Sequence, residues 1–112
     1  MKKLSQILIE SQTKRKQNFE CLVGRDDGKI ESYCAIGAIG CELGIITNED
    51  YAHTTGSVIR KSFEQLEISR GKDIPCPICD SKRDLGLLIV HMNDGHQQTF
   101  EQIGKYLEGL NL

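Results

Sequence analysis

Residues 76–96 have the sequence CPICDSKRDLGLLIVHMNDGH, and their spacing of cysteine and histidine is the strongest chemical signal in the chain. Cys76 and Cys79 are separated by two residues and are followed by His91 and His96. Zinc takes four nitrogen or sulfur ligands at tetrahedral corners, and a short gap between cysteines lets a tight turn aim both sulfurs at one point. The pattern predicts a Zn²⁺ site made of Cys76, Cys79, His91 and His96.

The segment between the two ligand pairs predicts a core helix. Residues 84–94 place four apolar side chains on one helical face, and Asn93-Asp94-Gly95 is expected to end the helix. The spacing is one residue short of a two-Cys two-His zinc finger, and Lys82 and Arg83 stand where the finger has an aromatic residue. We therefore expect a zinc knuckle over residues 74–98, joined to a helix. With all four positions filled by protein, the zinc would be structural and not catalytic.

Two other interpretations of these cysteines stay open. Cys76-Pro-Ile-Cys79 also resembles the glutaredoxin redox motif, but that fold needs a later cis-proline and the chain has only Pro75 and Pro77. Alternatively, the two cysteines form a buried core pair while His91 and His96 lie on a helix surface.

The rest of the chain predicts an α+β fold in a single domain, residues 1–112. Two short strands beginning at Phe19 and ending at Tyr33 flank an Asp27-Gly28 turn and form a small β-hairpin. About five short helices pack with it, and residues 71–80 form a loop. The helical segments are 3–15, the Ala- and Gly-rich 34–44, a turn at 47–50, 56–67, 84–94 and 99–110. Gly37 and Gly40 would weaken an isolated helix over residues 34–44, so we expect a helix there only where it packs closely against another element.

Composition restricts the environment and the partners. The chain has 112 residues, a formal net charge of −2 and no run of apolar residues long enough for a membrane span. Ser5, Gln6 and Glu10 break the N-terminal apolar stretch, which is unlike a signal peptide. We expect a cytoplasmic protein that does not contact the membrane. Its five cysteines, an odd number, fit a closed disulfide framework poorly.

Nucleic-acid binding is the alternative function. Base readout needs Arg, Asn, Gln or Lys along an exposed helix face, and residues 84–94 are apolar with acidic ends. Any contact with nucleic acid would instead come from Lys14, Arg15 and Lys16 at the end of the first helix. A charged helix end is usually solvated surface, so this alternative ranks below a protein partner.

A cysteine hydrolase is a more remote alternative. Cys34 begins a predicted helix, where the helix dipole lowers a thiol pKa, and His91 and Asn93 follow it in the chain order of papain-like enzymes. However, His91 and Asn93 point in different directions from one helix, and His91 has a competing role as a metal ligand. We therefore expect no catalytic residues, no small-molecule substrate and no enzyme activity.

Two segments together resemble a group of small bacterial, phage and archaeal proteins. Tyr33-Cys-Ala-Ile-Gly-Ala38 resembles their CALGA segment, and residues 89–108 resemble a segment HLND…H…EQIAxWLE that follows a cysteine pair. This chain has Tyr106 where that pattern has Trp, and Gly104 where it has Ala. The resemblance implies a scaffold in which the CAIGA helix packs on the Asn93 helix, and it implies no reaction. We expect a zinc-stabilised accessory protein of a virus, phage or mobile element that binds a protein partner.

Overall fold

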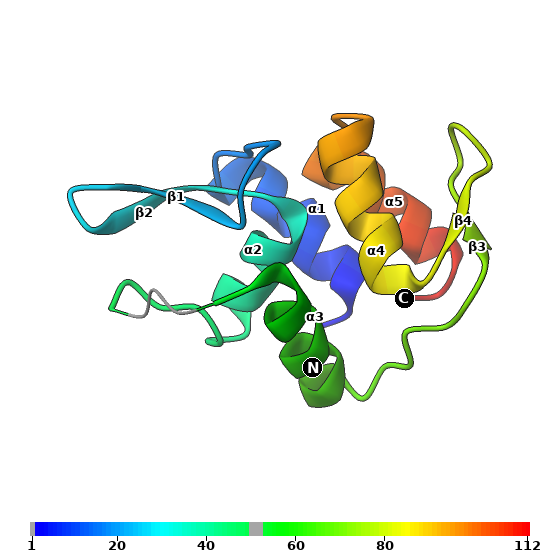
Figure 1. Ribbon diagram of the computed structural model, residues 1–112, viewed down its shortest axis with the longest axis horizontal. Coiled ribbons are helices and arrows are strands. Elements are labelled where there is room, and N and C mark those ends of the chain that lie inside the picture. The colour runs from blue at the N-terminus through cyan, green and yellow to red at the C-terminus, as the bar shows by residue number, and fades with distance from the viewer. Residues whose placement is uncertain (1, 50–52) are drawn as a thin grey trace.

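The computed structural model describes residues 2–49 and 53–112 and shows the predicted α+β fold. The molecule measures 39 × 26 × 22 Å, and two small antiparallel hairpins lie at opposite ends of the long axis with the helices between them (Figure 1). The elements in chain order are α1 (Leu4–Lys14), β1 (Val23–Asp26), β2 (Lys29–Tyr33), α2 (Ala35–Glu42), α3 (Thr55–Leu66), β3 (Ile74–Pro75), β4 (Lys82–Arg83), α4 (Leu85–Val90), η1 (His91–Gly95) and α5 (Phe100–Gly109).

Helices α1 and α5 pack against each other along their lengths. The α5 helix begins with the predicted capping box, in which Thr99 Oγ1 accepts the N–H of Gln102 at 3.1 Å and Gln102 Oε1 accepts the N–H of Thr99 at 2.9 Å. A Cβ atom added at Gly104 would lie 3.0 Å from the Ser5 carbonyl oxygen. The glycine therefore lets the two helix backbones approach closely.

The β1–β2 hairpin has the predicted turn. Asp27 and Gly28 both have positive φ angles, 50° and 77°, as a type I′ turn requires. The first strand begins at Val23 and not at Phe19 as predicted. Asn18 explains this difference, because its Oδ1 accepts the N–H groups of Glu20 and Cys21 at 3.2 and 3.1 Å and bends the chain before the strand.

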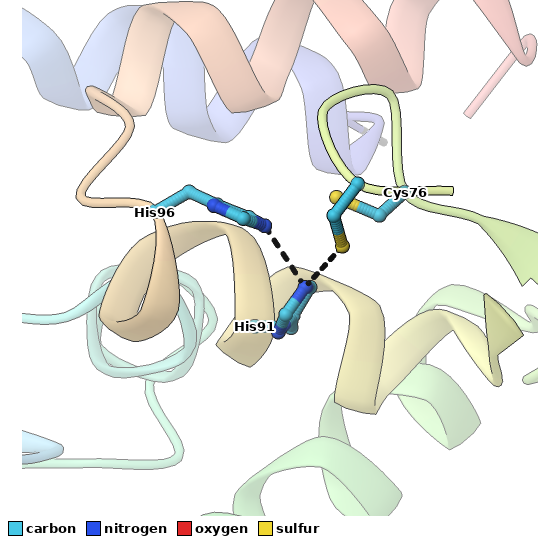
Figure 2. Close-up of side chains that lie close together, drawn as sticks. Cys76, His91 and His96 are labelled. Carbon is cyan, nitrogen blue, oxygen red and sulfur yellow. Dashed lines mark hydrogen bonds between the residues drawn. The ribbon is translucent and has the colours of Figure 1, made fainter. Parts of the chain in front are cut away.

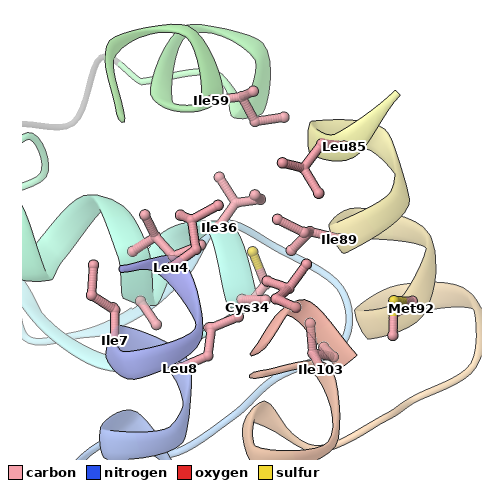
Figure 3. Close-up of a cluster of buried hydrophobic side chains, with 14 of the residues drawn as sticks. Leu4, Ile7, Leu8, Cys34, Ile36, Ile59, Leu85, Ile89, Met92 and Ile103 are labelled. Atoms are coloured by element: carbon pink, nitrogen blue, oxygen red, sulfur yellow. The ribbon is translucent and has the colours of Figure 1, made fainter. Parts of the chain in front are cut away.

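Helix α2 lies in the centre of the core, as its glycines predict. All residues from Ala35 to Gly40 are buried, and a Cβ at Gly37 would overlap the carbonyl group of Leu22. Figure 3 shows side chains from several helices converging on α2. Fully or nearly fully buried members of this cluster are Leu4, Ile7, Leu8, Cys34, Ile36, Ile59, Leu85, Ile89, Met92 and Ile103.

The structure corrects the sequence prediction at two further places. Residues 71–80 are not entirely loop, because Ile74 and Pro75 pair with Arg83 and Lys82 in the β3–β4 hairpin. Asn93-Asp94-Gly95 does not end the helix at once, since residues 91–95 continue α4 as one turn of π-helix. At the predicted turn 47–50, Asn48 and Glu49 form a turn without helix, and the last residue, Asp50, lies outside the described residues. Within the described ranges, no helix has the length and apolar character needed to cross a membrane.

Candidate metal site

The structure brings the four predicted ligand side chains together. One ligand atom from each of Cys76, Cys79, His91 and His96 lies within 4.8 Å of the others. The cysteines come from the turn between β3 and β4, while the histidines stand at either end of the π-helical turn η1 (Figure 2). The group could hold a metal ion, with cysteines and histidines that are 12 to 20 residues apart in the sequence.

Backbone hydrogen bonds shape the turn that carries the cysteines. The N–H of Cys76 donates to the carbonyl of Ser81 at 2.9 Å, and the N–H of Asp80 donates to the carbonyl of Cys76 at 3.0 Å. Asp80 has a positive φ of 64°, which closes the turn tightly. Ile78 also directs its N–H at the sulfur of Cys76 at 3.5 Å. Such N–H to sulfur contacts orient a cysteine ligand and stabilise its thiolate.

The π-helical turn accounts for the histidine pair. In an α-helix two residues five apart lie about 140° from each other around the axis, so their side chains diverge. In η1 the N–H of His96 donates to the carbonyl of His91 at 3.2 Å, a bond that spans five residues and brings His96 back over His91. The two Nε2 atoms lie 3.0 Å apart, and the rings meet edge to face.

The distances within the cluster suit an ion of the size of zinc. His91 Nε2 lies 3.3 Å from Cys79 Sγ and 3.0 Å from His96 Nε2 (Figure 2). Around a tetrahedral zinc, bond lengths of about 2.3 Å to sulfur and 2.0 to 2.1 Å to nitrogen place S···N at about 3.5 Å and N···N at about 3.3 Å. An outward shift of a few tenths of an ångström at these contacts would therefore make room for the ion.

The surroundings favour the metal-binding protonation states. Burial opposes ionisation of Cys76, but the N–H groups of Cys79 and Ile78 and the nearby Arg83 outweigh it and lower the pKa of the thiol. The pKa of His91 is lowered as well, in this case by burial first, and then by the nearby Arg83 and His96. A thiolate and a neutral imidazole are the forms that bind a metal ion.

Three contacts hold the site in the fold. The hydroxyl of Tyr106 in α5 donates to the carbonyl of Pro75 at 2.8 Å, next to the first cysteine. Asp84 caps α4 by accepting the N–H of Leu87 at 3.0 Å and also pairs with Arg70 at 3.1 Å. The cysteine turn and the helix that leads to His91 are thus fixed to the rest of the fold.

The remaining cysteines lie outside this cluster, and Cys34 has a structural contact. Cys34 is 6% exposed, and its sulfur accepts the N–H of Gly37 at 3.4 Å as the N-cap of α2. Burial raises the pKa of the Cys34 thiol to about 11, despite this hydrogen bond. That shift is opposite to the lowering that a nucleophilic cysteine requires. Cys21 is exposed and Cys41 is half-buried.

The residues considered for nucleic-acid contact are partly engaged within the fold. Arg15 pairs with Glu42 at 3.2 Å and stacks over Tyr33 at 5.6 Å from the ring centroid. Its side chain is only 16% exposed. Lys14 and Lys16 remain exposed at the end of α1. The basic segment thus has two accessible cations and one that is already neutralised.

Sequence analysis did not identify the role of Asn93. This side chain is fully buried, and its Oδ1 accepts the N–H of Ala35 at 3.1 Å and the amide of Gln17 at 2.7 Å. The contact joins the CAIGA helix to the segment between the two histidines. The sequence contains one signal for this contact: the resemblance pairs the CAIGA segment with the later Asn-Asp motif. That pairing does not show which atoms are in contact.

Comparisons with known proteins cover the family, the sequence and the structure. No family model, curated protein or solved structure matches the chain. The geometry and chemistry of the Cys76, Cys79, His91 and His96 group therefore carry the functional argument.

Proposed function

We propose that this chain is a non-enzymatic accessory protein, stabilised by a structural zinc ion, that acts by binding a protein partner. One observation carries the proposal: four side chains of the Cys₂His₂ type, from two separate elements, direct their ligand atoms to within 4.8 Å of one another. Four protein ligands complete a tetrahedral zinc shell and leave no position for a substrate.

The chemistry of the donors supports zinc over Mg²⁺ and Ca²⁺. Mg²⁺ and Ca²⁺ prefer oxygen ligands, whereas thiolate and imidazole together suit zinc. The two thiolates of Cys76 and Cys79 would balance the charge of the ion, with His91 and His96 neutral. The pKa values of Cys76 and His91 are both lowered, which is the direction that this charge distribution requires.

A structural role follows from what the ion would join. Zinc would link the β3–β4 turn to both ends of η1. Structural zinc supplies on the order of 10 kcal/mol to the folding of small domains. Whole domains are stable by only about 5–15 kcal/mol, so the ion would contribute a large part of the stability of this fold.

Two exposed apolar side chains beside the cluster support a protein partner. Ile78, between the cysteines, is 54% exposed, and Leu87, one helical turn before His91, is 51% exposed. Apolar contacts of this kind are typical of protein interfaces. The partial neutralisation of the basic segment by Glu42 disfavours nucleic acid, which needs free cations to pair with phosphates.

Chelation tests the structural role of the ion. Removing zinc with a strong chelator should lower the melting temperature by roughly 10 °C or more, with the largest loss of order in the turn between β3 and β4. An unchanged melting curve after confirmed metal removal would contradict it.

An electrophoretic gel shift compares the two classes of partner. The protein-partner proposal expects no tight binding to DNA or RNA. Sub-micromolar binding that weakens steeply with salt, and that is lost in the triple variant Lys14→Ala, Arg15→Ala, Lys16→Ala, would support the nucleic-acid alternative instead.

A further inference from the structure

Asn93 lies between the two histidines of the cluster, yet its side chain points away from them into the core. It is fully buried and sits in the middle of η1, two residues after His91 and three before His96. Its amide nitrogen donates to the carbonyl of Asn18 at 3.0 Å and to Asp94 Oδ1 at 2.7 Å. Its oxygen accepts from Gln17 and Ala35. All hydrogen-bonding positions of the amide are therefore used.

These bonds form a junction between distant parts of the chain. Gln17 donates its amide to Asn93 and to the carbonyl of Gln98 at 2.7 Å, and its Oε1 accepts the N–H of Phe100 at 3.0 Å. The linker after α1, which includes Gln17 and Asn18, thus meets the start of α2 at Asn93, and Gln17 connects this point to the start of α5. We call this set of bonds, centred on Asn93 with Gln17, Asn18 and Ala35, the Asn93 junction.

The junction also holds the β1–β2 hairpin. The N–H of Asn18 donates to the carbonyl of Tyr33 at 2.8 Å, and the N–H of Tyr33 donates to the carbonyl of Lys16 at 2.9 Å. The linker therefore pairs with the end of β2 and carries the hairpin, which projects from the helices in Figure 1. Asn93 is therefore bonded to the same linker that pairs with the base of this hairpin.

The position of Asn93 depends on the π-helical turn. Relaxation of η1 to an α-helix would place His96 about 140° from His91 around the axis and would rotate the residues between them, Asn93 included. A metal ion bound to both histidines prevents this rotation, because it holds the two Nε2 atoms on one centre. The contact between the rings is the weaker constraint that remains without the ion.

We propose that metal binding at Cys76, Cys79, His91 and His96 controls the Asn93 junction, and through it how firmly the β1–β2 hairpin is held on the helical core. The proposal rests on the proposed metal site. Because coupling between two sites is reciprocal, the junction must also influence metal affinity. The chain would then respond to metal at two places, the cluster itself and the hairpin at the opposite end of the molecule.

Amide hydrogen exchange, measured by NMR on the whole chain, tests the effect of metal on the junction. The N–H of Ala35 donates to Asn93, whereas the N–H of Ser57 donates to Thr54 Oγ1 at 3.1 Å in a similar cap at the start of α3. On removal of zinc, exchange at Ala35 should accelerate about tenfold or more while exchange at Ser57 changes little. Equal change at both amides, or none at Ala35, would overturn the coupling.

Metal titration of two glutamine variants tests the reverse direction. Gln12 and Gln17 each accept an N–H at the start of α5, from Glu101 at 2.9 Å and from Phe100 at 3.0 Å, but Gln17 also bonds to Asn93. With Co²⁺ as an optical probe, Gln17→Ala should weaken binding about fivefold or more, and Gln12→Ala less than about twofold. Equal affinities for the two variants would overturn the proposal.

The two proposals fail in different ways. Co²⁺ binding to the wild-type chain with no difference between Gln17→Ala and Gln12→Ala, and no change at Ala35, removes the coupling but leaves the metal site standing. Absence of Co²⁺ and Zn²⁺ binding to the wild-type chain removes both. If Gln17→Ala does not fold, the exchange measurement on the wild-type protein still decides the question.

Discussion

The side-chain oxygen of Asn93 accepts the backbone N–H of Ala35 at 3.1 Å, which joins the π-helical turn to the first turn of α2. The first N–H groups of a helix have no partner within the helix, and in the core water cannot supply one. Asn93 satisfies this group and the amide of Gln17 at the same time. The contact is thus both a helix cap and a link between segments 58 residues apart.

Replacement of Asn93 should therefore be costly. Asn93→Ala leaves the buried N–H of Ala35 and the amide of Gln17 without their acceptor, and we expect a loss of about 2–4 kcal/mol in the free energy of unfolding. Asn48→Ala is a matched control, because Asn48 Oδ1 accepts the N–H of Ile30 at 3.2 Å in an exposed position. Its loss should be less than about 1 kcal/mol in urea unfolding. Similar losses in both variants would contradict the role of Asn93.

Gly37 should not tolerate a side chain. A Cβ at this position meets the backbone carbonyl of Leu22, which a rotamer change cannot move aside. Gly37→Ala should destabilise the protein by about 1–3 kcal/mol. Gly56, also in the first turn of a helix, has no atom within 4 Å of an added Cβ, so Gly56→Ala should be neutral or stabilising by up to about 1 kcal/mol. Thermal melts of the two variants give the comparison, and equal stability would argue against close packing of α2.

The stability of the fold should depend on pH through the carboxyl group of Asp84. Burial opposes its ionisation, but the N–H of Leu87 and the side chain of Arg70 outweigh it and hold the pKa of Asp84 below its usual value of 3.8. A carboxyl with a lowered pKa stabilises the fold above the unfolded value, and this contribution is lost as pH falls through the folded pKa. Asp84→Ala should cost about 1 kcal/mol at neutral pH. The difference from wild type in denaturant unfolding should shrink below about pH 3.8, and a constant difference would contradict the charge contribution.

The thiols should differ sharply in reactivity. With its pKa raised to about 11, Cys34 is about one part in a thousand thiolate at pH 8. Iodoacetamide at that pH should modify the exposed Cys21 in the native protein and leave Cys34 unmodified until the chain is unfolded. Mass spectrometry of peptides locates the label. Fast modification of native Cys34 would restore the hydrolase alternative.

Local signals in the sequence predicted much of the fold. The Asp27-Gly28 turn and the Thr99 to Gln102 capping box need only residues close in the chain, and both are present. Close packing of α2 followed from Gly37 and Gly40, which would otherwise weaken a helix. These features could be predicted because each one depends on the intrinsic preferences of a few residues close in the chain.

Features that depend on tertiary contacts could not be predicted from the sequence in the same way. The β3–β4 hairpin has only two residues in each strand, and Pro75 and Lys82 show no strand pattern. The four candidate ligands followed from cysteine and histidine spacing, but the π-helical turn that unites His91 and His96 did not. An interval of five residues fits neither the α-helical repeat nor a strand, so only the structure shows why both rings face one point.

The ligands should contribute unequally. His91 Nε2 lies between Cys79 Sγ and His96 Nε2 and follows directly on α4, whereas His96 comes after Gly95 at the end of η1, where water can replace it. His91→Ala should therefore weaken Co²⁺ binding more than His96→Ala, by about tenfold. Optical titration of the two variants measures this ratio. A greater loss for His96→Ala would show that the end of η1, and not His91, dominates the site.

The metal content of the purified protein tests the central claim most directly. Elemental analysis at neutral pH should find zinc equimolar with the wild-type chain and with Cys21→Ser, whose cysteine is exposed but lies outside the cluster. Cys79→Ser, which changes a cysteine that is also exposed but lies within the cluster, should contain little or no zinc. Wild-type protein that contains no stoichiometric metal and takes up none from added Zn²⁺, or Cys79→Ser that retains a full equivalent, would contradict the account.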